Sequence, residues 1–144
     1  DRFGLSVEVR TPGDIPTRVE VVKRRDAFER DPEGFRTRWA KEDDRLRKRI
    51  TAARTRLPQV EVPDAMLERA AQLCLKLGTD GLRGELTLMR AARAFASLEG
   101  DRCVTDAHLR RVAPSALRHR LRRNPLDDAG SGTRVDRALQ EVFG

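Results

Sequence analysis

The sequence predicts a mainly helical protein, in which one N-terminal strand is followed by five or six helices packed as a bundle. Three observations predict this class. Apolar residues alternate with other residues over residues 3–9, which is typical of a strand. From Ile15 onward they recur at three- and four-residue steps, as on one face of a helix. Short connections rich in Pro and Gly separate these helical stretches and favour antiparallel packing.

The strand is predicted from four alternating apolar residues, Phe3, Leu5, Val7 and Val9. A single strand cannot pair its own backbone groups, so we expect its sheet to lie in sequence upstream. The chain opens on Asp1 without an initiator Met, so we expect an excised fragment. A turn at residues 11–14 follows the strand. We therefore divide the chain into a strand with its exit turn, residues 1–13, and a helical domain, residues 14–144.

Two long helices are expected next. Asp14 can cap a helix that starts at Ile15 and ends near Asp31, because the residue before a proline resists the helical conformation. A second amphipathic helix is expected to run from about Phe35 to Leu57 and to stop near Pro58.

Three or four further helices complete the prediction. Asp64 is expected to cap residues 66–77, with Gly78 as the C-terminal cap. The next helix, ending near Glu99, is apolar on most of its circumference, which favours a central place in the bundle. Thr105 is expected to cap a helix that reaches Leu121 and bends at Pro114. A loop over residues 124–133 and a short helix over residues 135–143 end the chain.

The composition is basic, with 30 Lys and Arg against 23 Asp and Glu, a net charge of +7 and a pI near 10.6. Such a positive net charge is typical of proteins that bind nucleic acid. However, acidic and basic residues are interspersed, as in residues 41–45, which is typical of solvated helices or subunit contacts. The chain has few aromatic side chains on which the bases of single-stranded nucleic acid could stack, namely five Phe, one Trp and no Tyr. We expect no nucleic-acid partner and, since no apolar run is long enough, no membrane span.

The cysteines and histidines do not form a metal-binding pattern. Cys74 and Cys103 lie in apolar surroundings without a CxxC pair, and we expect both to be small buried thiols. His108 and His119 do not complete a metal-ligand spacing with them, so no metal site is predicted. The chain also lacks a G-x-x-x-x-G-K-[ST] phosphate loop, so we expect this chain alone to be inactive.

Three motifs together resemble one protein family. Residues 1–9 (DRFGLSVEV), 80–87 (DGLRGELT) and 119–127 (HRLRRNPLD) are similar, in order and spacing, to segments of the ATPase subunit I of magnesium chelatases, which belongs to the AAA+ family. The similarity extends over nearly the whole chain. It implies an α/β ATPase core followed by a helical lid domain, with residues 1–13 as the last core strand and residues 14–144 as the lid.

The resemblance also implies roles for two arginines. Arg2 occupies the position of the arginine finger, which reaches the nucleotide bound by a neighbouring subunit, and is therefore the candidate catalytic residue. Arg83 occupies the position of sensor 2, which contacts the nucleotide of its own subunit. From the residues alone, an arginine is far more often a surface group in a salt bridge than a catalytic residue. Arg90, and the basic cluster from His119 to Arg123, stay open between a subunit contact and an ordinary helix surface or end.

For the intact protein, the resemblance implies ATP with Mg²⁺ as cofactor, bound mainly by the upstream core. It implies a homo-oligomeric, hexameric ring that works with a second AAA+ chelatase subunit and a large porphyrin-binding subunit. ATP hydrolysis would drive Mg²⁺ insertion into protoporphyrin IX in (bacterio)chlorophyll biosynthesis. The location would be the bacterial cytoplasm or the plastid stroma.

Three alternatives remain at this point. A cobalt chelatase ATPase subunit would share the fold, and a non-hydrolysing AAA+ partner subunit would be a scaffold. From another class, a basic helical nucleic-acid-binding module would bind with an affinity that falls steeply with salt.

Overall fold

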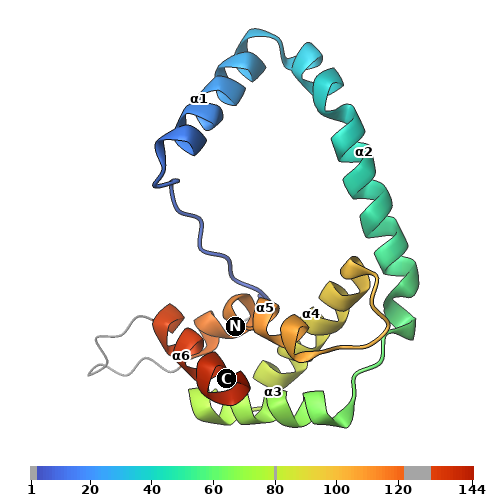
Figure 1. The fold of residues 1–144 in the computed structure, drawn as a ribbon, viewed down its shortest axis with the longest axis vertical. Coiled ribbons are helices and arrows are strands. Elements are labelled where there is room, and N and C mark those ends of the chain that lie inside the picture. The colour runs from blue at the N-terminus through green and yellow to red at the C-terminus, as the bar shows by residue number, and fades with distance from the viewer. Residues whose placement is uncertain (1–2, 80, 122–130) are drawn as a thin grey trace. The chain divides into compact units, whose positions relative to one another are not determined.

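The computed structural model describes residues 3–79, 81–121 and 131–144, and within these residues the protein is helical (Figure 1). The predicted helical class is confirmed. None of the described helices is long and apolar enough to cross a membrane. The helices, in chain order, are α1 Ile15–Arg30, α2 Pro32–Arg56, the 3₁₀ turn η1 Leu57–Gln59, α3 Asp64–Leu77, α4 Arg83–Glu99, α5 Asp106–Leu117, the 3₁₀ turn η2 Arg118–Arg120 and α6 Ser131–Phe143.

The chain divides into two compact units. One contains residues 52–144 together with the described residues 3–7 at the N-terminal end, and the other contains residues 8–51. Every residue of the buried apolar core belongs to the first unit, from Ala53 onward. Residues 8–51, all of which the structure describes, contain no buried residue.

The strand expected over residues 3–9 is not formed. This segment forms neither a helix nor a β-strand, and the side chains of Leu5, Val7 and Val9 are exposed. The only β pairing in the described part of the chain is an isolated bridge between Glu61 and Cys103. The physical reason is the one that governs any single strand: without a neighbouring strand its backbone groups cannot form a ladder.

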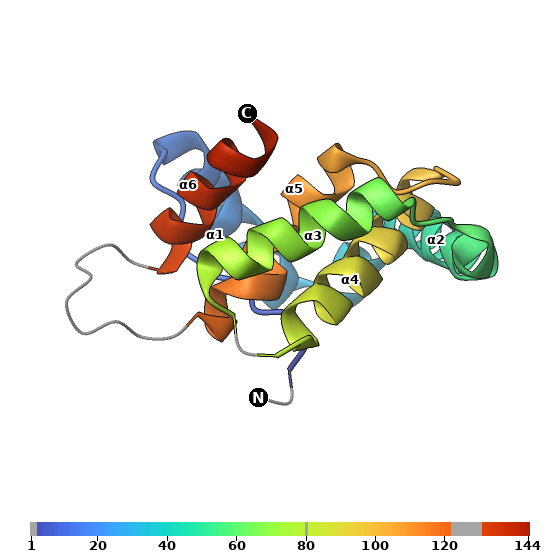
Figure 2. The same cartoon turned by 90° about the horizontal axis from the view of Figure 1, so that it is seen from below.

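Helices α3 to α6 form the core of the first unit (Figure 2), with α5 packed against α3, α4 and α6. The side chains of Leu73, Leu88, Leu109 and Leu117 are fully buried, one or more from each of α3, α4 and α5. Val135 and Ala138 of the C-terminal helix α6 are also buried in this core. Burying such side chains contributes about 1.5–3 kcal/mol each, so this cluster is the main source of stability.

Helix α4 is exposed mainly along one stripe. Leu88, Ala92 and Ala96 are inaccessible to solvent, whereas Leu86 is 50% exposed and lies on the same stripe as the exposed Arg83, Arg90 and Arg93. The helix packs against α3, α5 and η1, in agreement with the central place expected for it in the bundle.

The C-terminal ends of α2 and α4 are fastened by two hydrogen bonds. The buried Ser97 hydroxyl donates to the Ala53 carbonyl at 2.6 Å, and Arg56 Nη2 donates to the Ser97 carbonyl at 2.8 Å. The Ser97 carbonyl also accepts the Gly100 backbone N–H at 3.2 Å, so the bond from Arg56 is a second bond to that oxygen. The two side-chain bonds therefore hold the ends of α2 and α4 together.

The helix ends follow the predicted capping residues in most cases. Asp14 Oδ1 accepts the Thr17 backbone N–H at 2.8 Å. Hydrogen bonding to Thr17, first with its side chain and then with its backbone, lowers the pKa of the Asp14 carboxyl. Gly78 closes α3 in the left-handed conformation, with φ of 66°. Thr105 stands at the N-cap of α5. Asp64 is instead the first residue of α3, whose N-cap is Pro63, because Pro63 already takes the extended conformation that a cap needs.

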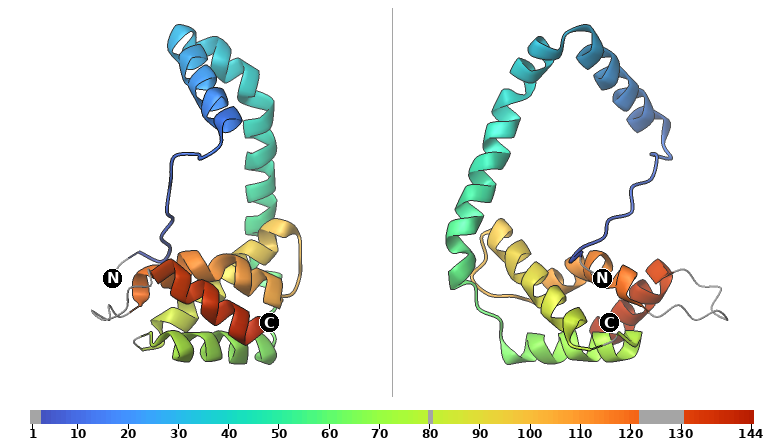
Figure 3. Two further views of the ribbon diagram at one scale, coloured as in Figure 1. Left: turned by 60° about the vertical axis from the view of Figure 1, so that its left-hand side comes forward. Right: turned by 180° about the vertical axis from the view of Figure 1, so that it is seen from behind.

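The unit of residues 8–51 consists of α1 and most of α2, joined by a sharp turn at Asp31 (Figure 3). Phe28, Phe35 and Trp39 contact one another in sequence, with ring centroids 5.7 and 6.1 Å apart. The Arg24 guanidinium lies 4.5 Å from the centroid of the Trp39 ring. A pocket of about 160 Å³ lies beside them, and its lining includes Lys23 and Arg38 but not Arg83.

Candidate functional site

Arg83 is the first residue of α4 and its side chain is exposed. The residue before it, Leu82, provides no side-chain cap, and Gly81 has a φ of 62°, in the left-handed region that favours glycine. Exposed backbone N–H groups at a helix start attract anions, and a guanidinium adds a permanent positive charge. A phosphate group is therefore a suitable ligand for this end of α4.

The start of α4 is held close to α3 by Gly84, which is buried. A Cβ atom at Gly84 would lie 3.2 Å from Cys74 Sγ and 3.0 Å from Thr79 Oγ1. Only a glycine allows this approach without displacing its neighbours. Because Gly84 follows Arg83 directly, the same contact fixes the backbone from which the Arg83 side chain extends.

Arg2 lies outside the described residues, but the segment that follows it has defined contacts. The Phe3 carbonyl accepts hydrogen bonds from His119 Nε2 at 3.1 Å and from Arg120 Nη2 at 3.0 Å. The Ser6 backbone N–H donates to the Ser115 carbonyl at 2.8 Å. The segment therefore lies against the end of α5 and η2, in the same compact unit as Arg83.

The same segment also reaches α4. A Cβ atom at Gly4 would lie 3.8 Å from Cγ2 of Thr87, which is ordinary van der Waals contact. Thr87 stands one helical turn after Arg83. The structure thus brings the residues just after Arg2 onto the helix that begins with Arg83.

For the basic cluster from His119 to Arg123, two interpretations were open, a subunit contact or a basic helix end. His119 and Arg120 instead hold the Phe3 carbonyl, while residues 122 and 123 lie outside the described part of the chain. Arg90 is exposed on α4, seven residues after Arg83. The sequence contains no local signal for the Phe3 contact, because its partners are more than a hundred residues apart.

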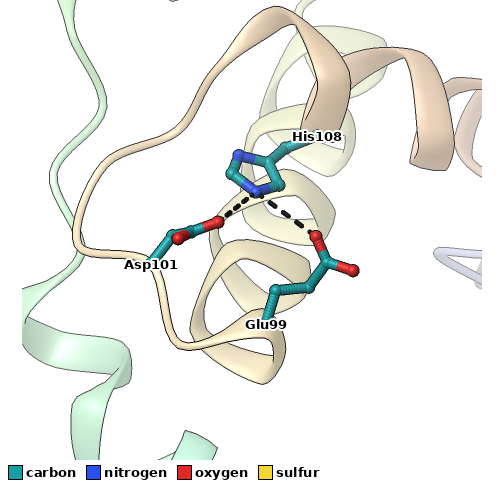
Figure 4. Close-up of side chains that lie close together, drawn as sticks. All are labelled: Glu99, Asp101 and His108. Carbon is teal, nitrogen blue, oxygen red and sulfur yellow. Dashed lines mark hydrogen bonds and ion pairs between the residues drawn. The ribbon is translucent and has the colours of Figure 1, made fainter.

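A second cluster, which sequence reasoning missed, consists of Glu99, Asp101 and His108 (Figure 4). The His108 side chain is almost completely buried, and its Nε2 lies 3.0 Å from Asp101 Oδ2 and 3.7 Å from Glu99 Oε2. On the other side of the ring, the Thr105 backbone N–H donates to Nδ1 at 3.0 Å. Two carboxylates and an imidazole are a possible ligand set for a divalent cation.

The hydrogen bonds of His108 favour a structural role for this cluster. Because Nδ1 accepts a backbone N–H, it carries no proton, so the proton of the neutral ring is on Nε2. Nε2 therefore donates to Asp101 and has no lone pair for a metal ion. The cluster fastens the loop before α5 to the start of that helix, and the absence of a metal site in this protein stays a prediction.

The two cysteines differ from each other. Cys74 is buried, as expected, and burial, together with the nearby charge of Glu85, raises the pKa of its thiol to about 11. Cys103 is exposed, so the expectation that it is buried is wrong. It stands on the extended link to α5, where its neighbour Val104 takes the buried side, and successive side chains of an extended chain point to opposite faces.

The fold and the candidate site together define a class of protein: a small helical domain that presents a fixed arginine at a helix start. The chain belongs to the AAA lid domain family, whose family model matches residues 67–142. This match covers α3 to α6 almost completely, including Arg83.

Relatives named as magnesium chelatase subunits are similar over almost the entire chain. The chain is 61% identical over 143 residues to the "Magnesium-chelatase 38 kDa subunit" of Acidiphilium rubrum, and 58% identical over 143 residues to the protein of that name from Cereibacter sphaeroides. It is 40% identical over 143 residues to "Magnesium-chelatase subunit ChlI, chloroplastic" of Oryza sativa subsp. indica. Each alignment covers 99% of this chain, and respectively 41%, 43% and 34% of the relative.

These similarities confirm the predicted resemblance to magnesium chelatase subunit I. The chain spans about two fifths of the length of the two bacterial relatives and one third of the rice relative.

Proposed function

We propose that this chain is the lid-bearing part of the ATPase subunit of a magnesium chelatase. The intact protein would hydrolyse ATP with Mg²⁺ and so support insertion of Mg²⁺, as substrate, into protoporphyrin IX. The observation that carries this proposal is the 61% identity, over 99% of the chain, to a protein named as a magnesium chelatase subunit. The match to the AAA lid domain model supports the ATPase part of the proposal.

In this proposal Arg83 acts as sensor 2. Its forked, permanently charged guanidinium is suited to phosphate oxygens, and the exposed amides at the start of α4 add a favourable field. The exposure of Arg83 and the fixed backbone at Gly84 support this role. ATP, when bound, supplies the phosphoryl group, and loss of the contact after hydrolysis would let the lid move.

Arg2 acts in this proposal as the arginine finger for the nucleotide of a neighbouring subunit. A finger stabilises negative charge that develops on the transferred phosphoryl group, and its removal costs about 10³–10⁵ in rate where it has been measured. The phosphate loop would come from the ATPase core outside this chain. The support for Arg2 is its place in residues 1–9, a segment covered by the alignments to the chelatase relatives.

The partners follow from the same proposal. The intact protein would assemble as a hexameric ring with a second AAA+ subunit and a porphyrin-binding subunit, in the bacterial cytoplasm or the plastid stroma. The relatives' names favour magnesium over cobalt as the substrate metal. No observation on the described residues favours the scaffold or nucleic-acid alternatives.

The test compares ATP turnover by the full-length protein with turnover by its Arg2→Ala, Arg83→Ala and Arg93→Ala variants. Arg93 is an exposed arginine on the same helix as Arg83 and serves as the matched control. We expect turnover to fall by about 10³-fold or more for Arg2→Ala, to fall clearly for Arg83→Ala, and to be unchanged for Arg93→Ala. Assembly of each variant is checked by size-exclusion chromatography.

Normal turnover in both Arg2→Ala and Arg83→Ala would contradict the two assigned roles. An assembled parent protein without any turnover would instead favour the scaffold subunit. Porphyrin metallation by the complete complex, followed by fluorescence with Mg²⁺ and Co²⁺ supplied in parallel, distinguishes the two chelatases.

A further inference from the structure

The pocket of about 160 Å³ in the unit of residues 8–51 is lined by residues of both α1 and α2. Its charged lining consists of three basic side chains and one acidic side chain, Lys23, Arg24, Arg38 and Glu20. The half-buried rings of Phe35 and Trp39 also belong to the lining. The pocket therefore combines positive charge with aromatic surface.

Two of the three basic side chains have no acidic partner. Arg24 Nε donates to Glu20 Oε1 at 2.7 Å, so these two charges compensate each other. This hydrogen bond lowers the pKa of Glu20, and the charges of Lys23 and Arg38 act in the same direction. Lys23 and Arg38 form no ion pair with any residue that the structure describes. Three positive charges against one negative charge leave a net charge of +2 on the lining, which favours an anionic ligand.

The size of the pocket favours a single side chain as its occupant. Pockets for cofactors and other small molecules usually have about 300–1,000 Å³, whereas a cavity of about 150 Å³ holds a benzene-sized group. A Glu or Asp side chain fits this space, and a whole nucleotide does not. The Trp39 indole N–H is shielded from solvent and has no acceptor among the described residues, which favours an occupant with acceptor oxygens over an apolar one.

An exposed apolar stripe lies beside the pocket on α1. Ile15, Val19 and Val22 follow one another at steps of four and three residues, so they share one side of the helix, and all three are exposed. Val19 stands one helical turn before Lys23. A free carboxylate or a phosphate backbone would leave this stripe in water, whereas an amphipathic protein segment can cover it and place an acidic side chain in the pocket.

We propose that the pocket and the stripe together form a docking site for an acidic, amphipathic segment of a partner protein. One Glu or Asp carboxylate of that segment pairs with Lys23 and Arg38, and its apolar side chains cover Val19 and Val22. The site lies in a different compact unit from Arg83 and adds a surface for partner recognition to the proposed function.

Fluorescence anisotropy of a dye-labelled probe peptide tests this site in the full-length protein. The probe is a synthetic amphipathic peptide of Glu and Leu, and the same peptide with Gln in place of Glu is its control. We expect the Glu peptide to bind at least about tenfold more tightly than the Gln peptide. Lys23→Gln and Arg38→Gln should each weaken binding of the Glu peptide about tenfold, the effect of one charge-assisted hydrogen bond.

Arg25→Gln is the matched control variant, because it removes the same charge from an exposed position on α1 outside the lining. It should change the affinity by less than about twofold. Val22→Ala should weaken binding of the Glu peptide about threefold to tenfold, because part of the apolar contact is lost. Circular dichroism checks the fold of each variant.

Three results would overturn the proposal. Equal losses in Lys23→Gln, Arg38→Gln and Arg25→Gln would show only a general attraction to a basic protein. An unchanged affinity in Val22→Ala would show that no amphipathic segment covers the stripe. Tighter binding of a single-stranded DNA oligonucleotide with the same charge as the Glu peptide would identify a phosphate ligand instead.

The charge-reversed double variant, Lys23→Glu with Arg38→Glu, gives a test that a loss of folding cannot imitate. Its lining would carry one positive and three negative charges, so it should reject the Glu peptide and bind a peptide with Lys in place of Glu. A double variant with the circular dichroism spectrum of the parent protein that does not gain binding of the Lys peptide would also overturn the docking site.

Discussion

At residue scale, His108 is a buried polar ring with a partner for each nitrogen. Its Nε2 donates to Asp101 and its Nδ1 accepts from the backbone of Thr105, while the Phe95 ring packs against it at 5.9 Å. A buried polar group that loses its partner costs about 1–3 kcal/mol. The ring therefore stabilises the connection between α4 and α5 as long as both bonds are kept.

His108→Ala should lower the free energy of unfolding by about 2–3 kcal/mol, because it removes two hydrogen bonds and leaves a cavity. Asp101→Asn should change it by less than about 0.5 kcal/mol, since the amide oxygen still accepts from Nε2. Urea unfolding followed by circular dichroism measures both. A large loss in Asp101→Asn, or a rise in Tm on adding Zn²⁺, would show that the ring is charged or binds metal.

The two thiols should react at very different rates. At pH 8, Cys103 should react with a thiol reagent in the native protein, because it is exposed, whereas Cys74 should react only on unfolding. Burial raises the pKa of Cys74 from 9.0 to about 11. Its contribution to stability is therefore complete below pH 9 and is lost as the pH rises through 11.

Mass spectrometry after timed labelling, with a Cys103→Ser control, checks this prediction. The control should show no rapid labelling at pH 8. Rapid modification of Cys74 in the native control protein would contradict the buried, protonated thiol.

At the scale of elements, the close packing of α3 against α4 depends on Gly84, which has no side chain. Gly84→Ala would gain about 1 kcal/mol in helix propensity, but its Cβ would press on Cys74 Sγ at 3.2 Å. Cys74 is completely buried and cannot move aside without disturbing the core. We expect a net loss of about 1 kcal/mol in the free energy of unfolding, because overpacking costs about 1–3 kcal/mol.

A double-mutant cycle with Cys74→Ala checks this explanation. Removing the sulfur relieves one of the two close contacts and leaves the one with Thr79 Oγ1 at 3.0 Å, so Gly84→Ala should be less destabilising in the Cys74→Ala background than in the parent. Equal effects of Gly84→Ala in both backgrounds, measured by urea unfolding, would mean that the sulfur contact is not the cause.

The helices could be predicted from the sequence because their signals are local. The periodicity of apolar residues places α1 to α6, and Asp14, Gly78 and Thr105 mark their ends within a few residues. Arg83 was found through a motif, and the structure adds its position at the first turn of α4. Contacts between residues that lie far apart in the sequence have no local sequence signal of this kind. The partners of Phe3, the surroundings of His108 and the exposure of Cys103 depend on how distant segments meet.

At the scale of the whole molecule, the two units should differ in stability. All buried apolar residues lie from Ala53 onward, and residues 8–51 depend on aromatic contacts and on ion pairs within each helix, such as Arg24–Glu20. Exposed pairs of this kind contribute little, about 0–1 kcal/mol each. The unit of residues 8–51 should therefore open before the bundle.

Trp39, the single tryptophan of the chain, lies in the weaker unit. Its fluorescence should change at a lower urea concentration than the main transition in far-ultraviolet circular dichroism, because the two signals report different units. A shortened chain of residues 52–144 should keep the main transition, with a free energy of unfolding within about 1 kcal/mol of the full chain. Coincident transitions would show that the 144 residues unfold as one cooperative body.

The hydrogen bond from Ser97 to Ala53 has a mechanical consequence. Helix α4 is a strut of about 21 Å between Arg83 and Ser97, and its backbone hydrogen bonds make it stiff along its axis. A movement of Ser97 that lengthened its 2.6 Å bond to the Ala53 carbonyl by about 1 Å would exceed the usual length of a hydrogen bond. The Ser97 hydroxyl therefore limits how far the C-terminal end of α4 can move away from Ala53 while the bond is kept.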